Sequence, residues 1–160
     1  MEMLLDKLPD NAPQAACDLL DFWHRSRQED GLPSRTEFSP AHLGPWLDDI
    51  SIYEYVPSKN DFQIVIDGEN IVKMMGEDWR GGYAREIDFR SDTSIHSALS
   101  VVRETEQPQI HLIHIFRKDW SRGVRLLMPV LRPCVGKKDV LQVFMAVFPI
   151  EFAADTDPFY

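Results

Sequence analysis

The chain has 160 residues, of which 44% are hydrophobic and 27% charged, and its formal net charge is −9. These values are typical of one globular domain, and an acidic chain without a run of Lys or Arg is a poor match for nucleic acid or an anionic membrane surface. No apolar stretch is long enough to span a membrane, the N-terminus lacks the order of a signal peptide, and Cys17 and Cys134 have neither metal nor redox spacing. We therefore expect a reduced, cytoplasmic protein, with a Cys17–Cys134 disulfide as the disfavoured alternative.

The first predicted element is an amphipathic helix over residues 11–29, in which Ala and Leu recur at helical spacing. Ser39-Pro40 is typical of a helix start and predicts a short helix through Leu43. Residues 50–56 and 62–66 have strand composition, and the turn residues between them predict a hairpin.

Short helices follow this hairpin. The strand ends at Asp67-Gly68, residues 69–75 form a short helix that Gly76 ends, and Gly81-Gly82 closes the next turn. A longer helix is predicted to begin at a cap, Ser91 or Asp92, and to run through Glu106, and Pro108 ends it.

Three apolar runs complete the chain, at residues 110–116, 124–131 and 140–148, with hairpin connections between them. The last run is apolar at nearly every position, which predicts a strand buried on both faces. The 92–106 helix can cover one face and the N-terminal helix the other. Pro129 lacks a ladder donor, so we expect a bulge or local break there.

The predicted fold class is therefore α+β, with a five-stranded antiparallel sheet and helices inserted between the second and third strands. We expect an N-terminal helix and cap over residues 1–32, the main domain over 33–149 and an acidic tail over 150–160.

This order of elements resembles the PAS fold. Residues 33–50, Pro-Ser-Arg-Thr-Glu-Phe-Ser-Pro-Ala-His-Leu-Gly-Pro-Trp-Leu-Asp-Asp-Ile, look like the Pro-x-Arg…Pro…Leu…Leu lead-in of a group of small bacterial stand-alone PAS proteins. Leu-Leu-Met-Pro at 126–129 is similar to that group's Leu-Leu-Pro strand, and the resemblance covers about residues 20–148. In that group the lead-in is followed by a strand and then by a Phe…Gly…Gly…Gly stretch, which here is similar to Phe62, Gly68, Gly76 and Gly81.

The resemblance implies a PAS-like sheet with short helices and one longer helix over one face and the N-terminal helix on the other. It also implies a sensory or regulatory module, while the sequence itself requires no cofactor and leaves open whether one is bound. The last predicted strand ends about ten residues before residue 160, so we expect no output domain after it. We therefore expect action in trans on a signalling protein such as a histidine kinase or response regulator.

A small ligand could occupy an apolar pocket in such a fold, although the same residues could simply fill the core. The candidate pocket residues are Met74, Met75, Trp79, Phe89, Ile95, Leu99, Val102, Val143 and Met145. Residues 69–92 contain no cysteine, which disfavours a covalent photosensor and leaves a noncovalent flavin open.

Histidines give few signs of a metal site. Some PAS domains bind haem through a histidine on the helix that corresponds to the predicted 92–106 helix, where this chain has His96. His96 lies off the centre of the apolar stripe of this helix, which favours a surface or rim position; the stripe consists of Ile95, Ala98, Leu99 and Val102. His111 and His114 lie three apart on a predicted strand, so their side chains should point to opposite faces and share no metal.

Three functions remain open. The first is the sensory module, whose N-terminal helix offers Leu19, Phe22 and Trp23 as a dimer or partner surface. The second is a small enzyme, an isomerase or thioesterase-like protein on a similar cup, for which His111, His114 and Asp67 are the available polar groups. The third is a protein-interaction module with a filled core. No catalytic constellation is evident, so we expect no enzyme.

Overall fold

The computed structural model describes residues 2–29, 31–91, 93–114 and 122–150. Within these ranges no helix has the length and apolar character needed to cross a membrane. The elements in chain order are β1 (Glu2–Leu5), α1 (Gln14–Ser26), α2 (Pro40–Leu43), a 3-10 helix (Gly44–Asp49), β2 (Ile50–Val56), a second 3-10 turn (Pro57–Lys59), β3 (Asp61–Ile66), α3 (Glu69–Met75), α4 (Ala84–Ser91), α5 (Ile95–Thr105), β4 (Gln109–His114), β5 (Arg122–Arg132) and β6 (Val140–Pro149).

The strands form one antiparallel sheet in the order β1-β4-β5-β6-β2-β3. The predicted α+β class and antiparallel sheet are confirmed, but the described chain has six strands where five were expected. The additional strand is β1, which pairs with β4 from Glu2↔Ile113 to Leu5↔Ile110. A segment of only four residues is too short for alternating apolar and polar side chains to predict a strand. β1 forms because the free edge of β4 offers it backbone hydrogen-bond partners. The predicted acidic tail, beyond Ile150, lies outside the described residues.

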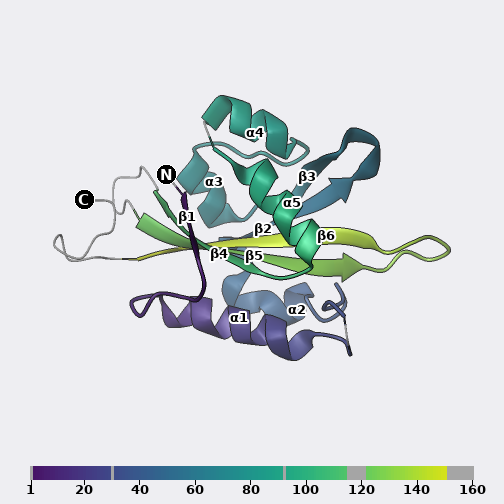
Figure 1. Cartoon of the computed structure of the whole chain (residues 1–160), viewed down its shortest axis with the longest axis horizontal. Coiled ribbons are helices and arrows are strands. Elements are labelled where there is room, and N and C mark those ends of the chain that lie inside the picture. Colours follow the sequence, from purple (N-terminus) through teal and green to yellow (C-terminus); the bar gives the residue numbers. More distant parts are fainter. Residues whose placement is uncertain (1, 30, 92, 115–121, 151–160) are drawn as a thin grey trace.

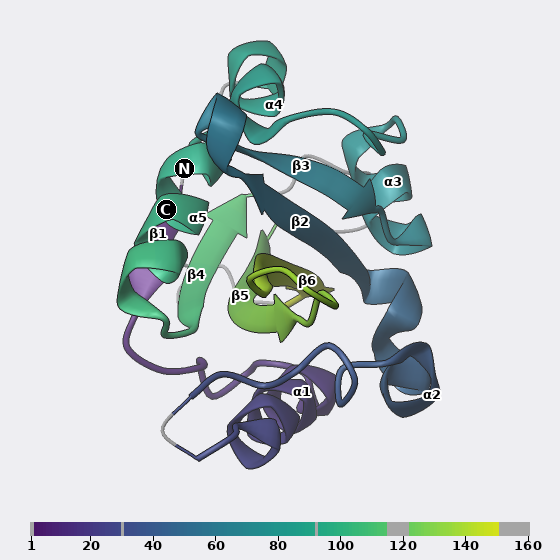
Figure 2. The ribbon, with the colours of Figure 1, turned by 90° about the vertical axis from the view of Figure 1, so that its right-hand side faces the viewer.

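Helices cover both faces of the sheet, as Figure 1 shows: α1 and α2 lie on one side, and α3, α4 and α5 on the other. Figure 2 gives the same layers from the end of the sheet, with α1 on the opposite side of β5 and β6 from β3 and α4. Each side has its own cluster of buried side chains, one beneath α1 and one beneath α5. The predicted two-sided cover is confirmed.

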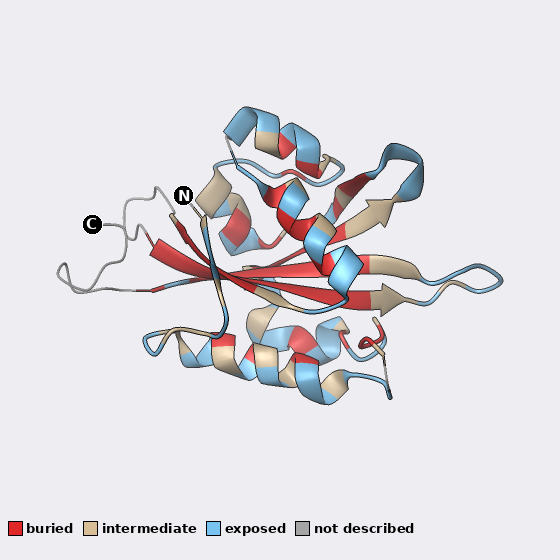
Figure 3. Cartoon of the chain, viewed as in Figure 1, coloured by how far each residue is buried: buried red, intermediate tan, exposed pale blue. Residues whose placement is uncertain are grey.

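Strand β6 shows why two covers are needed. Phe144 and Ala146 belong to the cluster beneath α1, whereas Val143 and Met145 belong to the cluster beneath α5. Because side chains alternate along a strand, both rows must be removed from water. The centre of the sheet is accordingly buried in Figure 3, while the outer sides of the helices are exposed.

Pro129 causes no bulge or break, which corrects the expectation from the sequence. The β5–β6 register runs without a shift from Gly123↔Pro149 to Arg132↔Val140. Leu131, two residues later, donates its N–H to Pro33 O on the side of β5 away from β6, and the β4–β5 ladder reaches no further along β5 than Leu127, where β4 begins. Alternation therefore directs the missing donor of Pro129 to a position that no neighbouring strand occupies.

The start of α5 was also predicted wrongly. Ser91 lies inside α4, and Asp92 is outside the described residues. The carboxylate of Asp88, in α4, accepts hydrogen bonds from the backbone N–H groups of Ile95 and His96 at 2.7 and 2.9 Å. A residue outside the helix thus satisfies the N–H groups that a helix start leaves open, and it ties α4 to α5.

Candidate functional site

A groove of about 830 Å³ lies on the α5 side of the sheet. It is bounded by α5, by residues of α3 and α4, by β4, β5 and β6, and by Glu2 and Leu4 of β1. Its apolar wall includes Met74, Met75, Ile87, Ile95, Met145 and Val147. Its polar residues include Ser94, Ser97, Gln109, His111 and Arg125. A concave, mainly apolar site with a few polar groups is the usual form of a small-molecule site.

The groove contains a buried positive charge, Arg125, on the central strand β5. Its side chain is 5% exposed, and it forms a bidentate ion pair with Glu2, with Nη1···Oε1 at 2.9 Å and Nη2···Oε2 at 3.1 Å. Burial alone would raise the pKa of Glu2, but the hydrogen bonds and positive charge of Arg125 lower the pKa on balance. The Arg125 Nε is buried and has no hydrogen-bond partner.

His111 lies beside this pair, because β4 places it directly opposite Arg125 in the ladder. Burial, reinforced by the charge of Arg125 and opposed by Glu2, lowers the pKa of His111 to about 4. The imidazole is therefore neutral at pH 7, and its Nδ1 is buried without a hydrogen-bond partner. Together with the Arg125 Nε, it gives this end of the groove two unused polar atoms in a structure where such atoms are normally paired.

The predicted pocket residues divide into three groups. Met74, Met75, Ile95 and Met145 line the groove. Trp79, Leu99, Val102 and Val143 are buried in the cluster beneath α5 and support the groove without lining it. Phe89 is 89% exposed on α4 and is no part of the wall, which corrects its assignment. Helical phase alone could not show which side of so short a helix faces the sheet.

His96 lies outside the groove lining. Its Nε2 is 3.1 Å from Asn60 O and 3.9 Å from the Asp61 carboxylate, and its ring packs edge-on against Phe62. The imidazole proposed as a haem ligand is thus engaged with the β2–β3 turn. In the described part of the chain, no group of three metal-binding side chains comes together.

The three polar residues considered for an enzyme do not converge. His111 and His114 both border the groove. Asp67 is not among its lining residues, and its carboxylate accepts hydrogen bonds from the Ser51 hydroxyl and the Trp79 backbone N–H. It therefore stabilises the connection between β2 and the turn after α3. Cys17 and Cys134 are free.

The apolar face of α1 is used inside the molecule. Leu19 and Trp23 are fully buried against the sheet, and Trp23 Nε1 donates to Pro129 O at 2.8 Å. Phe22 is half-buried and stacks on Phe38 and Trp46. The sheet covers Leu19 and Trp23, so of the two alternatives, packing within the molecule or a dimer or partner surface, these two residues take the first.

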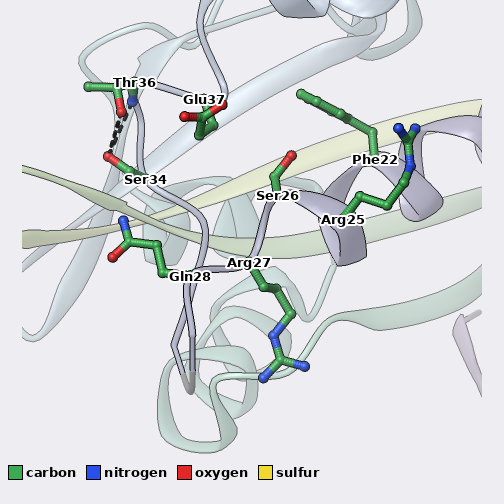
Figure 4. Close-up of a pocket in the computed structure, with 8 residues that line it drawn as sticks. All are labelled: Phe22, Arg25, Ser26, Arg27, Gln28, Ser34, Thr36 and Glu37. Carbon is green, nitrogen blue, oxygen red and sulfur yellow. Dashed lines mark hydrogen bonds between the residues drawn. The ribbon is translucent and has the colours of Figure 1, made fainter.

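A second pocket, of about 540 Å³, lies at the C-terminal end of α1 (Figure 4). Its walls are mainly polar, and the Thr36 hydroxyl donates to Ser34 within it. Figure 4 shows the guanidinium of Arg27 directed away from Ser34 and Thr36. The side chains do not converge on a common point, so this pocket has less of the character of a binding site.

Glu2 and Arg125 were not among the predicted site residues. The signal for Arg125 was present, because it is a charge inside the otherwise apolar run 124–131. A charged residue in a strand that is buried on both sides needs a partner or a ligand. Glu2 gave no such signal, since nothing in its local sequence marks it as that partner.

Comparisons with known proteins bear on the family to which the chain belongs. No curated protein sequence matches the chain significantly. A solved structure described as an RNA-binding light-oxygen-voltage receptor is similar over 93% of this chain and 38% of its own length, with 16% sequence identity and a TM-score of 0.43. A family model described as PAS domain matches residues 12–145. The chain therefore belongs to the PAS domain family.

Proposed function

We propose that this protein is a sensory PAS module that binds a small molecule in the groove beneath α5 and acts on a separate signalling protein. The observation that carries the proposal is the groove itself, in which an apolar wall from α3, α5 and β6 meets buried polar groups on β4 and β5. The groove of about 830 Å³ also has a buried, charged side chain in its wall, which the packing of apolar side chains does not by itself require.

The structure suggests how occupancy would be transmitted. Helix α5 contributes both to the groove, through Ile95 and Ala98, and to the core beneath it, through Leu99 and Val102. A ligand that contacts α5 would favour one packing of this helix over the sheet. A partner that distinguishes the two packings, such as a histidine kinase or response regulator, would read this shift in populations.

Native mass spectrometry of freshly purified protein, compared with a denaturing measurement, tests the binding step. We expect a mass that is lost on denaturation. The variant Ser97→Trp places a large side chain at the groove from an exposed position, and it should abolish the extra mass. Glu104→Trp is the matched control, because residue 104 is exposed on the same helix and does not line the groove.

Retention of the same bound mass by Ser97→Trp would place the ligand elsewhere. A bare chain mass for the wild type, together with no uptake of any added small molecule at the groove, would contradict the ligand-binding function. Partner binding is tested separately, by measuring whether candidate kinases bind the wild type and Ser97→Trp with different affinities.

A further inference from the structure

The ion pair between Arg125 and Glu2 joins a buried position of the groove to a short strand at the edge of the sheet. Arg125 lies on β5, at the centre of the sheet, whereas Glu2 lies on the four-residue edge strand β1. Within β1, Met3 is 37% exposed and Leu4 is 62% exposed. These two side chains contribute little to holding β1, which is attached by the ladder with β4, by the partly buried Leu5 and by the Glu2 carboxylate.

Arg125 cannot simply lose this partner. A buried guanidinium without a carboxylate is strongly unfavourable, because its charge is removed from water without compensation. A free ligand that carries its own carboxylate could replace Glu2, since the planar guanidinium binds any carboxylate in the same bidentate geometry. The apolar body of such a ligand would then lie along the methionine-rich wall, which adapts to different shapes.

We propose, on the basis of the ligand-binding function above, that the groove recognises small carboxylates with an apolar tail, and that Glu2 is an internal competitor for the same guanidinium. Binding of the ligand carboxylate to Arg125 displaces Glu2. Because Glu2 is part of β1, its displacement releases β1 from β4 and changes the edge of the sheet. The Glu2–Arg125 pair thus couples occupancy of the groove to the position of the N-terminal strand.

Octanoate is a suitable probe, and octanol is its uncharged counterpart of equal chain length. Titrations followed by NMR or calorimetry would give the dissociation constants for the wild type and three variants. Glu2→Gln removes the internal competitor and should bind octanoate about tenfold more tightly, with little change for octanol. Arg125→Met should lose the preference for octanoate over octanol.

Glu54→Gln is a matched control. Glu54 also pairs with an arginine on the sheet, Arg132, at 2.9 Å, and its side chain is 22% exposed compared with 26% for Glu2. It does not line the groove. This variant should bind both probes as the wild type does, which separates the loss of one ion pair from the loss of the competitor.

Amide hydrogen exchange provides the second readout. Saturating octanoate should remove the protection of the β1 amides in the wild type, and octanol should not. Equal affinities for octanoate and octanol in all variants would overturn the carboxylate proposal and leave the groove as a binding site. Octanoate binding with β1 still protected would overturn the displacement of Glu2. Absence of binding by both probes, even in Glu2→Gln, would overturn this inference, whereas the ligand-binding function itself is decided by the native mass measurement.

Discussion

Replacing Gly68 by alanine tests how tightly α3 is joined to the sheet. Gly68 precedes α3 with φ −65° and ψ 142°, a conformation that any residue can adopt, so glycine is not required there for its backbone angles. It is required for space, because a Cβ at this position would lie 2.5 Å from Ile50 O and 2.7 Å from Asp48 O. Both contacts are to backbone oxygens, one at the start of β2 and one in the preceding 3-10 helix, and backbone cannot rotate away as a side chain could.

The expected loss can be estimated from these distances. Forcing an additional methyl group into a well-packed site typically destabilises a protein by about 1–3 kcal/mol. The two close backbone contacts place Gly68→Ala at the upper end, so we expect the free energy of unfolding to fall by about 2–3 kcal/mol. The measurement is urea denaturation followed by circular dichroism, with the slope of the transition compared between variants.

Gly44→Ala is the matched control. Gly44 has helical angles, φ −38° and ψ −51°, and a Cβ there would have no atom within 4 Å. Alanine should therefore stabilise the protein slightly, by about 0.4–1 kcal/mol, through the lower entropy of the unfolded chain. A free energy of unfolding for Gly68→Ala within about 0.5 kcal/mol of the wild type would refute the steric argument, since that is the range of neutral surface substitutions.

Three further predictions follow from single contacts. Burial keeps His111 neutral, with a folded-state pKa of about 4 against 6.5 in the unfolded chain, so the free energy of unfolding should decrease as pH falls below 6.5. Between pH 7 and pH 5 the loss should be about 2 kcal/mol. Denaturation measured at both pH values should show a smaller loss for His111→Gln. Asp88→Ala removes the carboxylate that accepts from the first amides of α5 and should destabilise by about 1–2 kcal/mol, with faster hydrogen exchange in that helix; unchanged exchange would contradict this capping role. Trp23→Phe leaves Pro129 O without its indole donor and should lower the free energy of unfolding by about 1–3 kcal/mol in thermal or urea denaturation, whereas an unchanged value would mean that water replaces the indole.

The sequence allowed much of the fold to be predicted, because hydrophobic periodicity is a local property. The apolar run at 140–148 required covers on both sides, and β6 has them. The helical stripe that includes Ile95 and Leu99 predicted a helix against the sheet, and both residues are buried there. Four of the predicted pocket residues line the groove for the same reason, since these apolar side chains belong to the cluster beneath α5 or pack against it.

The partners of polar groups were decided only by tertiary structure. The carboxylate that pairs with Arg125 lies 123 positions away, and no local pattern marks it. It reaches Arg125 because the sheet order places β1 beside β4, and β4 beside β5. In the same way, the missing N–H of Pro129 costs no ladder hydrogen bond only because the pairing of β4 with β5 reaches no further than Leu127.

By itself, then, the sequence determined which residues leave water and in which kind of element, since burial of apolar side chains follows their spacing along the chain. The tertiary structure alone decided which buried charges meet, and that choice produced the groove with Arg125 and Glu2 at one end. The reason is that an ion pair depends on a distance of a few ångströms between two side chains, which the packing of distant strands sets.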